Sequence, residues 1–303
     1  MGIVINSDRG HKAAQLLFKA FSTTGIHGRT DMPEDVIPSN VAHGSLKHIL
    51  FITLTVSIDY QRDAAALWES SRLTFDDPAT SYLFDPQILH ETPLSTIVHD
   101  MQKHALSRKP QKDAGIWSNV GISFYKKWQG DPRNFLEGSN WDALKILDHL
   151  KNDIHLSDGR QVSDFPYLRG DKIGPLWLRM LRDNAGIENI RNLDRVPIPV
   201  DIHVGRATLA LGIVQGRYAG GFSNLFDTIR SAWFESVRGL QVGGRDMIAL
   251  DVDEALWHLS RFGCTSRDKQ SGECPLIESC EARSLCIRGK VDIRNSSTIE
   301  LDT

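Results

Sequence analysis

The stretch Val196-Pro-Ile-Pro-Val-Asp-Ile-His-Val204 interrupts the chain with two prolines and then opens a helical pattern. A proline lacks a backbone N–H and disfavours helix in the residue before it, so one helix ends before this stretch. Apolar residues resume at helical spacing in the run Ala207-Thr-Leu-Ala-Leu-Gly-Ile213. Asp201 therefore stands where a helix N-cap is expected, with its carboxylate facing the free amides of the first turn.

Helical periodicity extends outward from this break through most of the chain. Apolar residues recur at three- and four-residue spacing, for example at Ala13, Leu16, Leu17 and Ala20. Pro and Gly breaks divide the pattern into helices of about 10–18 residues. Strand signals are few and lie mainly in Lys290-Val-Asp-Ile-Arg294. The sequence predicts a mostly-α protein.

The composition is that of a globular protein, with 303 residues, 24% charged and 41% hydrophobic. Disordered and collagen-like classes are thereby excluded. The most apolar stretch, His48–Ile58, is about half the ~20 residues that a membrane helix needs, so it predicts a buried core helix and no membrane partner. Because no secretory leader is recognisable, we expect a cytoplasmic, reduced protein in which disulfides are disfavoured.

All four cysteines fall near the end of the chain, at Cys264, Cys274, Cys280 and Cys286, directly after the helical run Asp253–Gly263. Four thiolates on a short tether can hold a [4Fe–4S] cluster or a structural zinc ion. Zinc sites more often use paired cysteines two residues apart, and that spacing is missing here. The pattern favours the cluster, with zinc and unligated thiols as the alternatives.

Positive charge is concentrated in one segment, although the formal net charge is −3. Between Met101 and Arg133 seven basic residues stand against two acidic ones. Phosphate binding depends on such local fields rather than on total charge. Lys126 and Lys127 are candidate phosphate contacts in this segment, and the alternative is a solvated basic face without a partner.

Three elements occur in one order: the turn Gly170-Asp-Lys172 opening a helix, the segment Pro199–Val204, and the cysteine loop. In this order the chain resembles the helix-hairpin-helix DNA glycosylase superfamily, in particular its iron–sulfur branch of endonuclease III and MutY. There a Leu-Pro-Gly-Val-Gly-Arg-Lys hairpin precedes a Val-Asp-Thr-His helix start and a four-cysteine cluster. The long gap between Lys172 and Asp201 is similar to that of archaeal 8-oxoguanine glycosylases.

Two features depart from the family pattern. The cysteines are separated by nine, five and five residues rather than six, two and five. In the hairpin, Leu168 replaces the first glycine if Lys172 takes the catalytic lysine position. The other register makes Gly170 the first hairpin glycine, puts Gly174 at the lysine position and removes the nucleophile, so the first register is preferred.

The resemblance implies a two-lobed fold with the cluster loop near the C-terminus. One lobe would be a central helical domain with the hairpin, residues 39–184, and the other would combine residues 1–38 with residues 185–303. The substrate would lie between the lobes. The resemblance implies no obligate protein partner.

The implied activity is excision of a damaged or modified base that is flipped out of double-stranded DNA. Asp201 would stabilise positive charge on the sugar in the transition state. Lys172 would attack C1′ and form a Schiff base, from which β-elimination cuts the strand, giving AP lyase activity. The alternatives are a monofunctional glycosylase in which Asp201 orients water, and a DNA-binding protein that is stabilised by a cluster or zinc and has no catalytic activity.

Further DNA contacts follow from the same resemblance. Tyr60 or Gln61 would fill the space that the flipped base leaves. The remaining candidate contacts flank the two catalytic positions and are Arg169, Gly170, His203 and Arg206. Four aromatic residues are candidates to receive the base, although each is more often a core residue: Trp117, Tyr125, Trp128 and Trp177.

Overall fold

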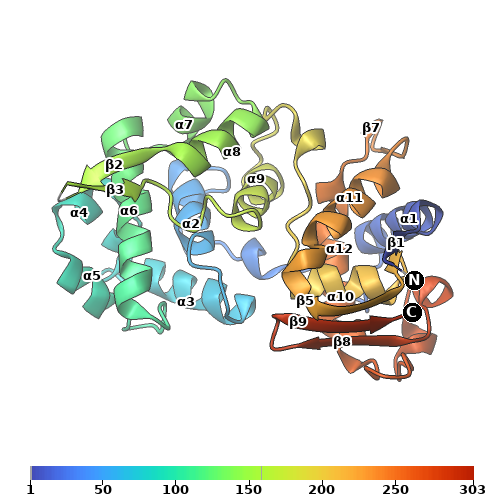
Figure 1. The fold of residues 1–303 in the computed structure, drawn as a ribbon. Coiled ribbons are helices and arrows are strands. Elements are labelled where there is room, and N and C mark those ends of the chain that lie inside the picture. The colour runs from blue at the N-terminus through green and yellow to red at the C-terminus, as the bar shows by residue number, and fades with distance from the viewer. Residues whose placement is uncertain (1, 158) are drawn as a thin grey trace. The chain divides into compact units, whose positions relative to one another are not determined.

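The computed structural model describes residues 2–157 and 159–303. These residues form two compact units. The central unit comprises residues 32–195, and the composite unit joins residues 2–31 to residues 196–303. The expected boundaries, after residues 38 and 184, lie near these divisions. Helices make up most of the regular structure of the described residues, which confirms the predicted mostly-α class at this level (Figure 1).

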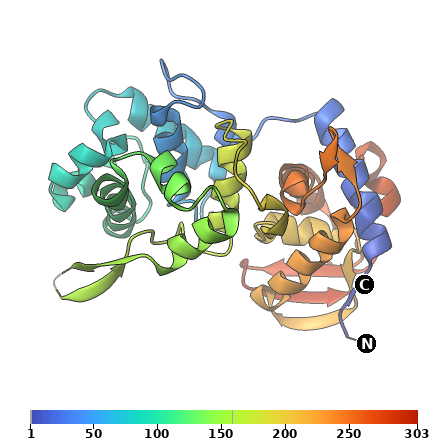
Figure 2. The same ribbon diagram turned by 90° about the horizontal axis from the view of Figure 1, so that it is seen from above.

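The central unit is a set of helices with one small β-hairpin. Its elements, in chain order, are η1 (Pro33–Asp35), α2 (Leu46–Val56), α3 (Ala64–Asp76), η2 (Ser81–Phe84), α4 (Pro86–Glu91), α5 (Leu94–Asp100), α6 (Pro110–Trp128), α7 (Pro132–Gly138), α8 (Ala143–Asn152), β2 (Ile154–Ser157), β3 (Arg160–Ser163), α9 (Ile173–Asp183) and η3 (Leu193–Arg195). Strands β2 and β3 pair antiparallel, and this hairpin extends away from the helices of its unit (Figure 2).

Helix α2 forms the middle of the central unit, as its sequence predicts. Nine of its 11 residues are buried, and it packs against α3, α6 and α9. A helix that is apolar all round is stable only when neighbours cover every face. Among the described residues, none of the helices has both the length and the apolar character that crossing a bilayer requires.

The composite unit combines helices with a small sheet. Its elements are β1 (Val4–Ile5), α1 (Ser7–Thr23), α10 (Ile202–Ala210), β4 (Val214–Gln215), β5 (Arg217–Gly221), η4 (Phe222–Leu225), α11 (Phe226–Val237), β6 (Gln241–Val242), β7 (Arg245–Asp246), η5 (Ala249–Val252), α12 (Asp253–His258), a π-helical turn η6 (Leu259–Gly263), η7 (Cys264–Ser266), η8 (Ile277–Ser279), η9 (Arg283–Leu285), β8 (Lys290–Arg294) and β9 (Thr298–Asp302).

The sheet of the composite unit is antiparallel, in the order β5-β9-β8. Strand β8 has the bounds expected from the sequence, and its Val291 and Ile293 are buried against α10 and the rest of the unit's core. The expectation that strands are confined mainly to this segment was incomplete. Strands β5 and β9 are short, and their glycine and charged residues obscure the two-residue periodicity that identifies a strand.

Candidate functional site

Asp201 caps the N-terminus of α10, which confirms the local structure expected from the two prolines. One carboxylate oxygen, Oδ1, accepts hydrogen bonds from the backbone N–H of His203 at 2.8 Å and of Val204 at 3.0 Å. The side chain remains half-buried rather than enclosed. The cap thus holds the carboxyl group of Asp201 at the N-terminus of α10.

Ser260, in the π-helical turn η6, joins two of the predicted contact residues. Its hydroxyl Oγ accepts a hydrogen bond from Arg206 Nη1 at 3.2 Å and lies 3.2 Å from His203 Nδ1. Burial lowers the pKa of Arg206, while its electrostatic interactions with Cys264 and Asp201 act in the opposite direction. Arg206 therefore lies close to both the candidate catalytic carboxylate and the first cysteine.

The four cysteines are unpaired and half-buried, and they lie close enough to affect one another's ionisation. Burial, together with the neighbouring thiols, raises the pKa of Cys264 to about 12. Burial likewise raises the pKa of Cys280 to about 11. Cysteine binds a metal as the thiolate, so a metal bound here would displace the protons that burial favours on Cys264 and Cys280.

A buried arginine also contributes to this group. Arg267 is 7% exposed and its Nη1 lies 3.4 Å from Cys286 Sγ. A donor set of four sulfurs with one adjacent guanidinium fits either a [4Fe–4S] cluster or a structural zinc ion, because both take four thiolates. Three basic residues of this part of the chain are each paired with a glutamate: Arg283 with Glu278, Arg288 with Glu273, and Lys290 with Glu300.

Lys172 immediately precedes α9 in the central unit, as the preferred register requires. Its Nζ lies 3.8 Å from Asp59 Oδ2, and its side chain is 32% exposed. Gly174, the lysine position of the rejected register, is buried, and a Cβ there would lie 2.8 Å from Leu147. A side chain at this position would have to displace the Leu147 side chain, so the glycine allows α9 to pack closely on α8.

The segment between α8 and α9 is longer than a simple helix-hairpin-helix turn. It contains the β2–β3 hairpin, which the sequence did not predict, followed by the turn that ends at Lys172. Leu168, which replaces the first hairpin glycine, is fully buried. Arg169 is exposed beside it, and the backbone N–H of Gly170 donates to the carbonyl of Tyr167 at 2.9 Å. The hairpin match is thus limited to the residues next to the helix.

Tyr60 takes part in an aromatic stack that the sequence did not predict. Its ring lies 4.4 Å from the ring of Tyr167, centroid to centroid, with 23° between the planes. The ammonium of Lys112 lies 5.0 Å and 4.8 Å from the two ring centroids, and that of Lys109 lies 5.3 Å from Tyr60. We call Tyr60, Tyr167, Lys109 and Lys112 the aromatic–lysine surface.

Tyr167 of this surface and Gln61, the neighbour of Tyr60 in the chain, have unusual backbone conformations. Gln61 has φ 51° and Tyr167 has φ 64°, both in the left-handed region that bulky residues avoid. Gln61 Oε1 accepts a hydrogen bond from Lys109 Nζ at 3.1 Å. The hydroxyl of Tyr60 donates to the buried Asp113, and burial raises the pKa of Tyr60. Strained residues that the surrounding structure holds in place are concentrated at functional sites.

The other predicted DNA contacts in the central unit differ in what they contact. Lys126 and Lys127 are both exposed. Lys127 is paired with the fully buried Asp164 and donates to the carbonyl of Ile154 at 3.2 Å, so it neutralises a buried charge. Trp117 and Trp177 are fully buried, which corrects the suggestion that either receives a base. Tyr125 and Trp128 are half-buried.

The sequence did not identify Lys112 and Tyr167 as candidate DNA contacts. Lys112 lies within the basic segment, and Tyr167 lies three residues before the hairpin glycine Gly170. Only the packing of α6 against the turn before α9 brings the two together with Tyr60.

The chain was also compared with known proteins. No protein-family model matches its sequence, and no curated protein matches it. The function is therefore inferred from the site residues and from the motifs that resemble the glycosylases.

Proposed function

We propose that the chain is a DNA glycosylase of the helix-hairpin-helix type that excises a damaged or modified base. The observation that carries the proposal is the position of Lys172 beside Asp59, next in sequence to Tyr60 of the aromatic–lysine surface. Nucleic-acid bases stack on aromatic rings, and lysine ammonium groups neutralise phosphates. A candidate nucleophile and a candidate nucleotide-binding surface thus belong to one part of the central unit.

Asp201 is assigned the electrostatic role in base removal. Cleavage of the N-glycosidic bond leaves positive charge on the sugar, and a fixed carboxylate stabilises that charge without reorganising. The two backbone N–H groups of the helix cap hold Asp201 in one orientation. Arg206 and His203, both bonded to Ser260, supply donors for a phosphate beside it.

Lys172 is assigned the nucleophilic role in the bifunctional form of the enzyme. Its neutral amine would attack C1′, displace the base and form a Schiff base, and β-elimination would then break the strand. The nearby Asp59 carboxylate stabilises the ammonium, which is not nucleophilic. This contact favours a second candidate, a monofunctional glycosylase in which Asp201 orients an attacking water and Lys172 binds phosphate.

The cysteine centre is assigned a structural role. Cys264, Cys274, Cys280 and Cys286 would hold a [4Fe–4S] cluster, with zinc as the alternative, and Arg267 would offset part of its negative charge. The bound group would fix the loop from Cys264 to Cys286, whose own regular structure consists of single 3-10 turns.

The proposal is tested by trapping the covalent intermediate. The purified protein is incubated with duplexes carrying a panel of damaged and modified bases, and borohydride is added. A protein–DNA adduct that Lys172→Ala abolishes and Lys126→Ala retains supports the bifunctional form and identifies the base. Alkali-sensitive abasic sites without an adduct, lost in Asp201→Asn, support the monofunctional form. Duplex binding without base release from any substrate would overturn the proposal in favour of a non-catalytic DNA-binding protein.

A further inference from the structure

The loop that follows α1 brings a histidine to the cysteine loop. Ile26 and Arg29 exchange two backbone hydrogen bonds, of 2.9 Å and 3.1 Å, around the pair His27-Gly28. Both central residues have positive φ, 50° at His27 and 69° at Gly28. Such a turn favours asparagine followed by glycine, so a histidine in the first position is unusual. The turn fixes the direction in which the imidazole leaves the backbone.

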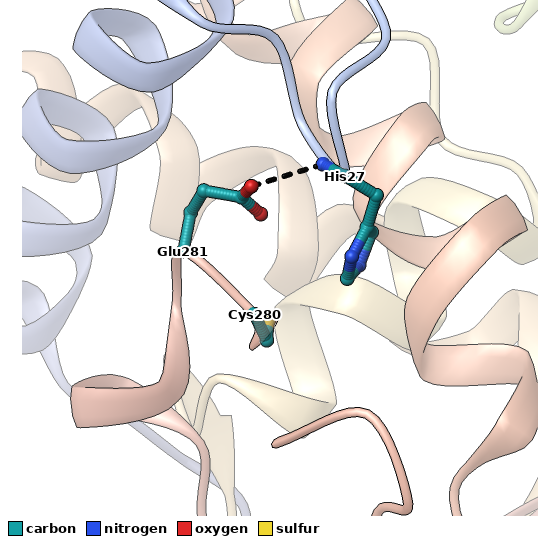
Figure 3. Close-up of side chains that lie close together, drawn as sticks. All are labelled: His27, Cys280 and Glu281. Carbon is teal, nitrogen blue, oxygen red and sulfur yellow. Dashed lines mark hydrogen bonds between the residues drawn. The ribbon is translucent and has the colours of Figure 1, made fainter. Parts of the chain in front are cut away.

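The cysteine loop leaves room for this imidazole. Gly263 directly precedes Cys264, and a Cβ at Gly263 would lie 2.4 Å from His27 Nε2. Any other residue there would displace the ring. The backbone N–H of His27 also donates to Glu281 Oε1 at 3.1 Å, so the turn is attached to the residue that follows Cys280 (Figure 3).

Three potential ligand atoms converge at this point. His27, Cys280 and Glu281 each offer one ligand atom, and these three atoms all lie within 4.8 Å of one another. Within the described part of the chain, two of the buried polar atoms here, His27 Nε2 and Glu281 Oε2, have no hydrogen-bond partner. Buried polar atoms are nearly always satisfied, and one cation between the three side chains would satisfy both.

We propose that His27, Cys280 and Glu281 form a binding site for a divalent cation of borderline softness, Zn²⁺ by ligand chemistry. Zinc accepts imidazole nitrogen, thiolate sulfur and carboxylate oxygen in tetrahedral geometry. Its bond lengths place neighbouring ligand atoms about 3.5 Å apart, which small side-chain rotations reach from the present arrangement. Three protein ligands leave one position for water.

The site shares Cys280 with the four-cysteine centre, so the two cannot be filled together. Zinc bound by His27, Cys280 and Glu281 excludes a [4Fe–4S] cluster bound by all four cysteines. This inference rests on the ligand geometry and not on the proposed glycosylase activity, and only the exclusion depends on the cluster assignment.

The site is tested on the full-length apo-protein by measuring metal content. Cys274→Ser removes one cluster ligand and leaves the three proposed zinc ligands intact. After incubation with Zn²⁺ and dialysis, we expect one zinc per chain by elemental mass spectrometry. Adding His27→Asn to Cys274→Ser is expected to lower the zinc content at least tenfold, because asparagine suits the same turn but supplies no imidazole. Adding Glu281→Gln instead is expected to lower the zinc content by a similar factor. His11→Ala, a histidine of α1 outside the site, is the matched control and keeps one zinc.

Two results would overturn the site. The first is that the double variant Cys274→Ser, His27→Asn still binds one zinc per chain while circular dichroism shows that it is folded. The other is zinc lost in Cys274→Ser alone, which would mean that the four cysteines bind it. With Co²⁺ as the probe, the thiolate-to-cobalt absorption must disappear in Cys280→Ser and persist in Cys264→Ser.

The exclusion is tested by iron–sulfur reconstitution under anaerobic conditions. Zinc-loaded wild-type protein is expected to take up less cluster, measured by visible absorption, than zinc-free protein, and His27→Asn is expected to remove the difference. One cluster and one zinc in the same chain would refute the shared cysteine. If no variant takes up a cluster but Cys274→Ser still binds zinc, the cluster assignment fails and the zinc site stands.

Discussion

Helix α2 and the cysteine loop show two different ways of holding a segment in place. In α2 nine of 11 residues are buried, and apolar contacts with α3, α6 and α9 surround it. The loop from Cys264 to Cys286 has only short 3-10 turns, and most of its side chains are exposed or half-buried. The central unit therefore depends on apolar burial, whereas this part of the composite unit would depend on ligand bonds to the proposed cluster or metal ion.

The largest expected effect concerns a buried ion pair in the central unit. Arg179 and Glu34 form an ion pair with side chains 1% and 4% exposed. Arg179→Met leaves a buried carboxylate without its partner, and we expect a loss of about 3–5 kcal/mol in the free energy of unfolding. Urea unfolding followed by circular dichroism measures it.

The control for this pair is an exposed one in the composite unit. Arg217 and Asp302 are 74% and 54% exposed, and Arg217→Met should cost less than about 1 kcal/mol. Adding Glu34→Gln to Arg179→Met should recover part of the lost stability by removing the unpaired charge. Equal losses for Arg179→Met and Arg217→Met would contradict the importance of burial for the Arg179–Glu34 pair.

The next effect concerns Asp201 and separates catalysis from helix capping. Asparagine caps a helix about as well as aspartate, so Asp201→Asn should leave the melting temperature nearly unchanged. It removes the negative charge, and we expect base release to fall by about 10²–10³-fold in single-turnover assays.

The matched control for Asp201 is another aspartate cap. Asp85 accepts from the backbone N–H of Gln87 at 2.9 Å and of Ile88 at 3.2 Å at the start of α4. Asp85→Asn should change neither stability nor base release. A large loss of stability in Asp201→Asn would mean that its carboxylate serves the fold instead.

A smaller effect is expected from the aromatic–lysine surface. Tyr167→Asn removes the stacked ring, and asparagine tolerates the positive φ of this position, so the fold should persist. We expect single-stranded or flipped DNA to bind about 1–3 kcal/mol more weakly, measured by fluorescence anisotropy. Tyr82→Asn, the same change at a half-buried tyrosine of this unit that is not a candidate DNA contact, should leave the affinity unchanged. Equal losses in both variants would indicate a general effect on the unit.

The smallest effect distinguishes a lysine that would contact phosphate from a lysine that pairs with a buried carboxylate. Lys112→Ala should reduce the slope of log affinity against log salt by about 0.9, the contribution of one phosphate contact on duplex DNA. Lys127→Ala should leave the slope unchanged and instead destabilise the protein, because it removes a partner of the buried Asp164. A slope change in Lys127→Ala, with none in Lys112→Ala, would reverse these assignments.

Periodic segments were predicted well, and segments held by distant contacts were not. The buried helix over His48–Ile58, the cap at Asp201, the helix after Lys172 and the strand Lys290–Arg294 follow from local patterns. The β2–β3 hairpin interrupts a region that the glycosylase pattern fills with a short turn. Strands β5 and β9 pair with each other across about 80 residues of chain, and a local sequence pattern cannot predict such long-range pairing.

The candidate site divides in the same way. The sequence by itself determined the residue types: an aspartate placed to cap a helix, a lysine at a helix start, and four clustered cysteines, because each follows from neighbours in the chain. Only the tertiary structure decided that Tyr167 stacks on Tyr60 beneath Lys112, and that Lys127 pairs with a buried carboxylate. It also brought His27 to Cys280, 253 residues away, because such contacts arise from packing and loop geometry rather than from local sequence.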